Sequence, residues 1–223
     1  TIEAEGPETH IGALCHIFSQ NNRMVLAEVV GFKDKQVLLM PIGDMSGIGP
    51  GSIVEAADKD LAVGVGQNLL GRVLDGLGNP IDGKGPVDIE KYYPVNNMPP
   101  NPMTRPRITQ PLPLGVKCID GLTTVGKGQR LGIFAGSGVG KSTLIGMIAK
   151  NTKADINVIA LIGERGREVR DFLERDLGDE GLKRSVVVIA TSDQPALIRL
   201  KGALVATAIA EYFRDCGKDV LLL

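Results

Sequence analysis

A glycine-rich run that ends in lysine, serine and threonine is the strongest chemical signal in this chain. It reads Ala135-Gly-Ser-Gly-Val-Gly-Lys141-Ser142-Thr143 and lies between an apolar stretch and a helix-forming stretch. That is the context a phosphate-binding loop, or P-loop, requires. Its glycines let the backbone curl so that successive N–H groups point inward at phosphate oxygens. The helix expected from about Lys141 adds the positive end of its dipole.

Two side chains of this loop are suited to holding a nucleotide together with Mg²⁺. Lys141 can reach the β- and γ-phosphates, and the Ser142 hydroxyl can ligate Mg²⁺. Ala135 replaces the usual first glycine, but that position closes the strand and does not need to touch phosphate. The predicted phosphate cradle comprises Gly136, Ser137, Gly138, Val139, Gly140, Lys141, Ser142 and Thr143.

A second group of charged residues follows the next apolar stretch. Gly163-Glu-Arg-Gly-Arg-Glu-Val-Arg170 comes directly after Ile156–Ile162. In open α/β sheets, ligands bind at the carboxyl ends of the strands. A carboxylate at that edge can orient and polarise a water for in-line attack on a γ-phosphorus. The spacing alone is equally consistent with a charged loop and a solvated first helical turn.

Strands and helices alternate from Leu114 onward, and these elements must position both groups. Buried strands alternating with helices predict a mostly parallel α/β sheet with right-handed crossovers. The expected strands are Arg130–Ala135, Ile156–Ile162, Ser185–Ala190 and Val220–Leu223. The expected helices are Ser142–Lys150, Arg167–Leu177 with Gly178 as its stop, and a long helix from Pro195 to Gly217. Thr191, Ser192 and Asp193 either touch the site or cap this last helix, and capping is favoured.

The first quarter of the chain has the pattern of short strands. Met24–Phe32 and Gln36–Met40 are rich in Val, Leu and Phe, and Ser46–Ser52 is dense in turn residues. This spacing predicts a small antiparallel barrel or sandwich. Further on, the stretch between Pro94 and Pro113 is rich in proline. It is either a linker or an extended strap laid over a domain, and we favour the strap because apolar residues follow it directly.

Composition gives no support to several classes of function, and only a local patch could bind nucleic acid or an anionic membrane. With 25 basic and 26 acidic residues, the chain gives no global argument for binding nucleic acid or an anionic membrane. It contains no apolar run near the ~20 residues that a membrane span needs. Cys15, Cys118 and Cys216 are far apart and odd in number, which favours reduced thiols. His10 and His16 have no flanking Cys or Asp cluster, so no metal site is predicted there.

Three motifs together resemble the catalytic subunits of the rotary ATPase superfamily. They are Gly136–Ser142, Gly163–Arg170 and Ala210-Glu-Tyr-Phe-Arg-Asp215. Within that superfamily the chain is similar to the ATPase of type III protein export, above all its flagellar branch. Gly71-Arg-Val-Leu-Asp-Gly76 and Val125-Gly-Lys-Gly-Gln-Arg130 fit as well, so the resemblance covers nearly the whole chain.

The resemblance implies a two-part architecture. We expect a partial N-terminal β-barrel at residues 1–58, followed at 59–223 by an α/β RecA-like P-loop domain. This second domain would include the strap 94–113 and a mostly parallel sheet truncated at the C-terminus. Val220–Leu223 resembles the lead-in to the Walker B acid. That acid, the arginine finger, the adenine-side loop and the C-terminal helical domain of the family would then follow, so we expect a fragment that is a poor ATPase in isolation.

The resemblance also implies roles for single residues. Glu164 corresponds to the family's glutamate that activates the attacking water, and Arg165 to an arginine that approaches the γ-phosphate. Lys141 and Ser142 keep the roles given above. Glu168 lies one helical turn after Glu164. It either contacts the residues that bind the nucleotide, without touching the nucleotide itself, or belongs to a solvated helix face.

The implied function is ATP hydrolysis, with Mg²⁺, by a ring hexamer that energises flagellar protein export. Its partners would be stator and stalk proteins of the export apparatus, export substrates and their chaperones, and no nucleic acid. It would be cytoplasmic, touching the inner face of the membrane only peripherally at the export apparatus.

Rival functions remain at this stage. A virulence-type secretion ATPase shares these motifs. The catalytic subunit of a rotary ATP synthase resembles the chain broadly, but Ser137 and Gly166–Val169 fit the export branch better. A non-catalytic subunit would lack an acid at position 164. A motor of RecA or Rho type needs a basic surface with aromatic residues, and aromatic residues are only 4% here.

Overall fold

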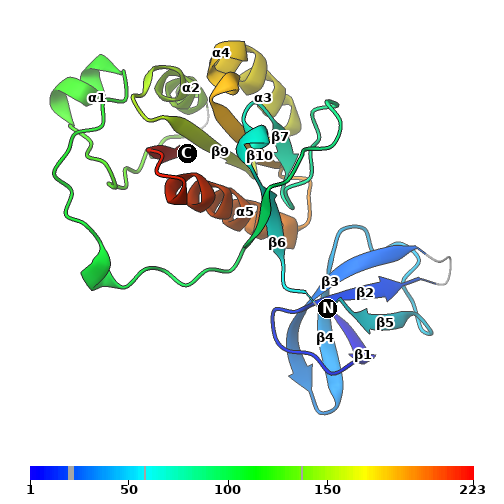
Figure 1. The fold of residues 1–223 in the computed structure, drawn as a ribbon. Coiled ribbons are helices and arrows are strands. Elements are labelled where there is room, and N and C mark those ends of the chain that lie inside the picture. The colour runs from blue at the N-terminus through cyan, green and yellow to red at the C-terminus, as the bar shows by residue number, and fades with distance from the viewer. Residues whose placement is uncertain (20–22, 58, 137) are drawn as a thin grey trace.

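The computed structural model describes residues 1–19, 23–57, 59–136 and 138–223 (Figure 1). The N-terminal part is a five-stranded antiparallel sheet in the order β1-β4-β3-β2-β5. Its strands are β1 (Ile2–Glu5), β2 (Leu14–Phe18), β3 (Met24–Lys33), β4 (Gln36–Ile42) and β5 (Ile53–Ala56). Alternate side chains of β3, namely Val25, Ala27 and Val29, are buried, and Ala27 and Val29 belong to the core of this sheet. The expected N-terminal barrel, including its two predicted central strands, is confirmed.

The second part contains a four-stranded parallel sheet in the order β11-β9-β10-β7. Its strands are β7 (Val73–Asp75), β9 (Ile156–Ile162), β10 (Ser185–Ala190) and β11 (Val220–Leu222). The long helix α5 (Ala196–Asp215) packs on one face of the sheet. The other face is covered by α2 (Lys141–Asn151), α3 (Gly166–Asp171), the π-helical turn η3 (Phe172–Leu177) and α4 (Gly178–Lys183). This is the mostly parallel α/β layering predicted from the sequence.

Smaller elements lie between β5 and α2 along the chain. A two-stranded antiparallel pair forms from β6 (Ala62–Val65) and β8 (Lys91–Pro94). The short helices are η1 (Gln67–Leu69), η2 (Pro102–Thr104) and α1 (Lys117–Leu122). Among the described residues, no helix has both the length and the apolar character to cross a membrane.

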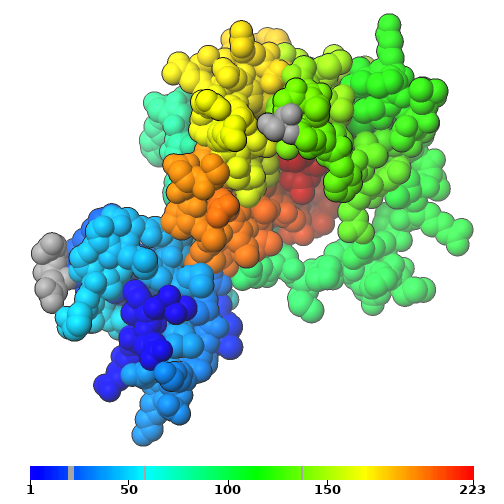
Figure 2. Space-filling model, turned by 180° about the vertical axis from the view of Figure 1, so that it is seen from behind, coloured from blue at the N-terminus to red at the C-terminus, as the bar shows by residue number. Residues whose placement is uncertain are grey.

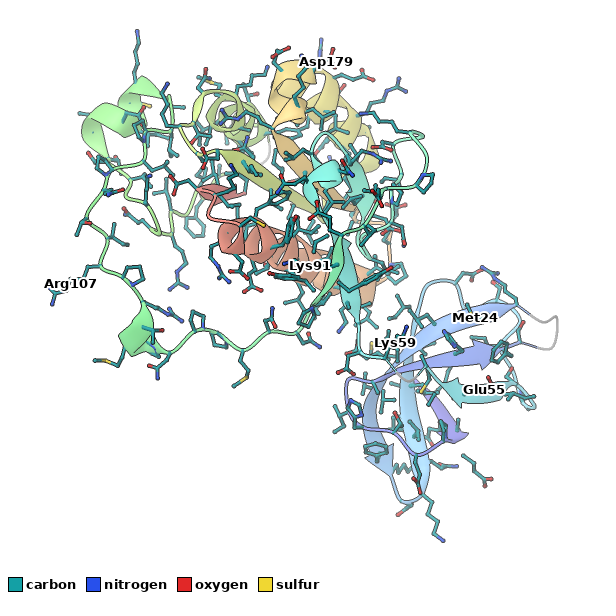
Figure 3. The ribbon with its side chains drawn as sticks, viewed as in Figure 1. Met24, Glu55, Lys59, Lys91, Arg107 and Asp179 are labelled. Carbon is teal, nitrogen blue, oxygen red and sulfur yellow. The ribbon has the colours of Figure 1, made fainter. Side chains whose placement is uncertain are left out.

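The proline-rich stretch contacts the second part near both of its ends: Asn97 donates to Glu211 of α5 at 2.8 Å, and the Lys127 N–H donates to the carbonyl of Gln110 at 2.9 Å. The strap over residues 94–113 stays a prediction, and residues 96–111 show little burial. All of these residues are exposed, and Figure 3 shows Arg107 pointing away from the body of the molecule. Buried Val95 and Leu112 hold the two ends. Residues between these two ends are exposed because proline removes backbone donors and because no side chain of this stretch is buried against the sheet.

The predicted strand Arg130–Ala135 is also wrong. These residues are not assigned to any strand, and the Phe134 side chain is 96% exposed. Of these residues, Ile133 packs against an apolar cluster that includes Val125 and Ile148. A strand needs a neighbour for its N–H and C=O groups, and among the described residues this segment has none.

Gly178 marks a break in a helical run rather than its end. Its φ of 59° lies in the left-handed region that favours glycine, and it closes η3. The chain then turns directly into α4, which lets Leu182 pack on the sheet. By contrast, α5 begins after Pro195 and ends just before Gly217, as expected.

A largely buried ion pair closes the turn after β7. The Arg72 guanidinium donates to both carboxylate oxygens of Asp82, from Nε at 2.7 Å and from Nη2 at 2.8 Å. The Val73 backbone N–H donates to the same carboxylate at 3.1 Å. Arg72 thereby holds the pKa of Asp82 below its usual range. Because the folded-state pKa is depressed, this stabilisation is complete above the unfolded-state pKa of ~3.9 and is lost as the pH falls below it.

Asp82→Asn is therefore expected to lower the free energy of unfolding by about 3 kcal/mol at pH 7, because it leaves Arg72 buried without its partner charge. Urea unfolding of the intact protein at pH 7 and pH 3 measures this, and the variant should lose less stability on acidification than the wild type. Asp34→Asn is the control, since Asp34 lies exposed in a turn at φ 54°, which asparagine also adopts. An equal loss in both variants would contradict a specific role for the buried pair.

Candidate nucleotide-binding site

The two predicted motifs meet in one cleft. It has a volume of about 560 Å³ and lies where the glycine-rich loop, the start of α2 and the carboxyl end of β9 come together. Its lining residues are Ala135, Gly136, Gly138, Gly140, Lys141, Ser142, Thr143, Glu164, Glu168, Asp171 and Asp176. Ser137 lies outside the described residues, and the exposed Val139 is not part of the lining.

The loop has its shape because two of its glycines adopt backbone angles that other residues avoid. Gly138 has φ 78° and Gly140 has φ 94°. Gly140 is the N-cap residue of α2, and the helix begins with Lys141. The backbone amides of a first helical turn have no acceptor within their own helix. The cleft therefore faces the positive end of the helix dipole, which suits an anionic ligand.

Lys141 and Glu164 face each other across this cleft. The Lys141 Nζ lies 3.6 Å from Oε1 of Glu164, and both side chains are partly exposed. Water screens such a pair, so its contribution to stability is small. The pair matters for its geometry. It places a cation that can bind phosphate oxygens next to a carboxylate that can bind a water molecule.

The backbone around Glu164 is held by the neighbouring strand. The Gly163 N–H donates to the carbonyl of Ala190 at 2.7 Å, and the Ser192 N–H donates to the carbonyl of Glu164 at 3.0 Å. The loop after β10 thus touches the site through its backbone. No side chain caps α5, so the predicted capping by Thr191, Ser192 and Asp193 is wrong. A hydrogen bond from Thr191 lowers the pKa of Asp193 instead.

Arg165 lies at the surface, whereas Glu168 lies in the cleft. Arg165 is the N-cap residue of α3, and its Nη1 lies 3.5 Å from Oε1 of Glu168. Glu168 lines the cleft beside Glu164, whereas Arg165 is not among the lining residues. Of the two residues carried over after β9, only Glu164 therefore lines the cleft.

Two acidic residues that line the cleft were not predicted from the sequence. Asp171 lies three residues after Glu168, on the same side of α3, a spacing that could have indicated it. Asp176 lies close because Gly146 lets η3 pack tightly on α2: a Cβ at position 146 would lie 2.7 Å from the Cβ of Asp176. Nothing in the local sequence indicates that contact.

The charges of the cleft favour an anion that arrives with a divalent cation. Four carboxylates line it against a single lysine among the described lining residues. The part of the chain that the structure describes holds no cluster of three or more His, Cys, Asp or Glu residues able to bind a metal on their own. Mg²⁺ commonly binds through one or two protein oxygens together with substrate phosphates. The Ser142 hydroxyl, at the start of α2, fits that arrangement.

Comparisons with known proteins agree with this geometry. The family model described as "ATP synthase alpha/beta family, nucleotide-binding domain" matches residues 115–223, and the model for the beta-barrel domain of the same family matches residues 1–57. The flagellum-specific ATP synthase of Bacillus subtilis is 59% identical over 230 aligned residues, which cover 100% of this chain and 51% of that protein. The type 3 secretion system ATPase of Xanthomonas euvesicatoria is 51% identical, covering 100% of this chain and 50% of that protein.

A solved structure has the same fold. The assembled ATPase EscN in complex with its central stalk EscO, from the type III secretion system of enteropathogenic E. coli, superposes with a TM-score of 0.89 at 47% identity. The match covers 99% of this chain and 54% of that chain. The chain therefore spans about half the length of the relatives that it matches.

Proposed function

Because the chain belongs to the ATP synthase alpha/beta family, we propose that it is the barrel and nucleotide-binding part of an ATPase that energises type III protein export. The observation that carries this proposal is the meeting of Lys141 and Glu164, 3.6 Å apart, in the cleft beneath the glycine-rich loop. The proposed boundary between barrel and nucleotide-binding domain falls at residue 58, which lies outside the described residues.

In this proposal ATP binds with its phosphates against the loop 136–143 and the start of α2. Lys141 contacts the β- and γ-phosphates, where it offsets charge that grows in the transition state. Mg²⁺, held by the Ser142 hydroxyl and the phosphates, would supply further positive charge there. Glu164 holds the attacking water and takes up its proton. Arg165, exposed beside the cleft, turns toward the γ-phosphate when nucleotide is bound.

The whole protein would act as a ring of six copies around a stalk. Support comes from the assembled EscN, whose solved complex includes the central stalk EscO. Stator proteins, export substrates and chaperones would be its other partners, at the cytoplasmic face of the export apparatus. The identity to a flagellum-specific relative favours flagellar over virulence-type export. The catalytic subunit of a rotary ATP synthase remains the second candidate, supported by the family model alone.

Release of inorganic phosphate from ATP by the intact protein tests the activity. We expect turnover that depends on Mg²⁺ and stops when EDTA removes it, because the cleft otherwise places a polyanion among four carboxylates. Deleting the gene, and then restoring it on a plasmid, tests the process. Loss of secreted flagellar protein in the deletion strain, and its recovery with the plasmid, would support a role in export. Mg²⁺-dependent turnover without any effect on export would favour the ATP synthase alternative, and the absence of turnover would contradict both candidates.

A further inference from the structure

A buried ion pair connects the N-terminal sheet to the nucleotide-binding domain. Glu28 of β3 and Lys201 of α5 lie 173 positions apart, and Nζ of Lys201 lies 2.8 Å from the carboxylate of Glu28. Their side chains are only 4% exposed for Lys201 and 12% for Glu28. Such a pair adds little net stability, because both charges lose their water. Its position in the fold is therefore more informative than its strength.

Glu28 faces α5 because of the alternation of β3. Ala27 and Val29 face the core of the N-terminal sheet, so Leu26 and Glu28, at the alternate positions, are on its outer face. Leu26, together with Leu14 and Ile42, packs into the same apolar cluster as α5. Figure 2 shows the first turns of α5, in orange, lying against the blue sheet. The ion pair thus lies within an apolar contact between the two parts.

The next residue of the same helical turn lies beside the strands that carry the site. Gly202 follows Lys201 and lies against the carboxyl ends of the two central strands of the parallel sheet. A Cβ at position 202 would lie 3.0 Å from the Cδ1 atom of Ile162 and 3.3 Å from the Cβ of Ala190. Ile162 comes two residues before Glu164, and the carbonyl of Ala190 accepts the hydrogen bond of Gly163.

These contacts form a continuous path from the N-terminal sheet to the carboxylate that faces Lys141. Glu28 pairs with Lys201, the turn containing Lys201 packs closely against Ile162 and Ala190 at Gly202, and Ala190 accepts the hydrogen bond of Gly163, the residue before Glu164. Interiors are close-packed, so a displaced helical turn shifts its neighbours rather than compressing.

We propose that the Glu28–Lys201 pair is a positioning element for Glu164, through which the N-terminal sheet sets the geometry of ATP hydrolysis. The proposal rests on the proposed function of the site. It makes Lys201 a positioning residue that has no contact with the nucleotide. It also gives the N-terminal sheet a part in turnover, in addition to any part in assembly.

Three variants of the intact protein test this proposal: Lys201→Met, Glu28→Gln, and the double variant E28Q/K201M. In each, kcat is expected to fall about 10- to 100-fold, the size of effect that a misplacement of about 1 Å can produce, with little change in KM for ATP. Hydrogen exchange should speed up in peptides that contain residues 160–166 and 190–194. Lys183→Met is the control, because Lys183 pairs with Glu180 at the surface of α4, outside the cleft. This control variant should change neither kcat nor the hydrogen-exchange rates of these peptides.

The double variant separates positioning from stability. It removes both buried charges, so its thermal stability should recover toward that of the wild type. If kcat and the exchange rates recover together with stability, the pair is merely structural and the proposal is overturned. If kcat stays low and local exchange stays fast in a stable double variant, the proposal holds. A wild type that releases no phosphate would contradict the proposed function instead, and the exchange comparison would still decide whether the pair positions residues 160–166.

Discussion

Replacing Glu164 with glutamine in the intact protein is expected to lower kcat for ATP hydrolysis by about 10²- to 10⁴-fold while nucleotide binding persists. Glutamine has nearly the same size and still accepts hydrogen bonds, but its amide cannot take a proton from water. Glu164 lies in the cleft with its backbone fixed by Ser192, so the substitution changes the chemistry of one group and leaves its position intact.

Steady-state phosphate release and the affinity for a fluorescent ATP analogue measure the two expected effects. Glu174→Gln is the matched control, because Glu174 pairs with Arg170 at the surface, outside the cleft. A fall of less than tenfold with binding intact would contradict the assignment of Glu164 as the base. Glu168 would then be the acid to examine, since it lines the same cleft.

Lys141→Ala is expected to lower kcat for ATP hydrolysis by at least about 10²-fold, which would abolish useful turnover, without unfolding the N-terminal sheet. Lys141 is the lysine among the described residues that line the cleft, where four carboxylates surround the space for the phosphates. Without it, negative charge that develops on the γ-phosphate is offset only by Arg165, backbone N–H groups and Mg²⁺. Binding should weaken as well, because the same cation contacts the ground-state phosphates.

Phosphate release, nucleotide affinity and far-ultraviolet circular dichroism together check this result. Lys150→Ala is the control on the same helix: Lys150 lies in the last turn of α2, where its Nζ donates to the carbonyl of Arg175, away from the loop. A folded Lys141→Ala variant that turns over ATP like the wild type would remove Lys141 from the site and with it the main support for the proposed function.

Elements governed by local sequence were predicted well. The loop before α2 follows from its glycines, since Gly138 and Gly140 adopt φ values that few other residues tolerate. The strands β9 and β10 are continuous apolar runs, and α5 has helical periodicity between Pro195 and Gly217. In each case the preference lies in neighbouring residues, so it is already visible in the chain.

Features that depend on distant partners were predicted poorly or not at all. Arg130–Ala135 is apolar enough for a strand, yet a strand forms only where another strand accepts its hydrogen bonds. Asp176 enters the cleft because a glycine on another helix leaves room for it. The pairing of Glu28 with Lys201 depends on how β3 and α5 meet in the fold. Hydrogen-bond partners and close packing between segments far apart in the chain are properties of the folded molecule, and local residue patterns carry no record of them.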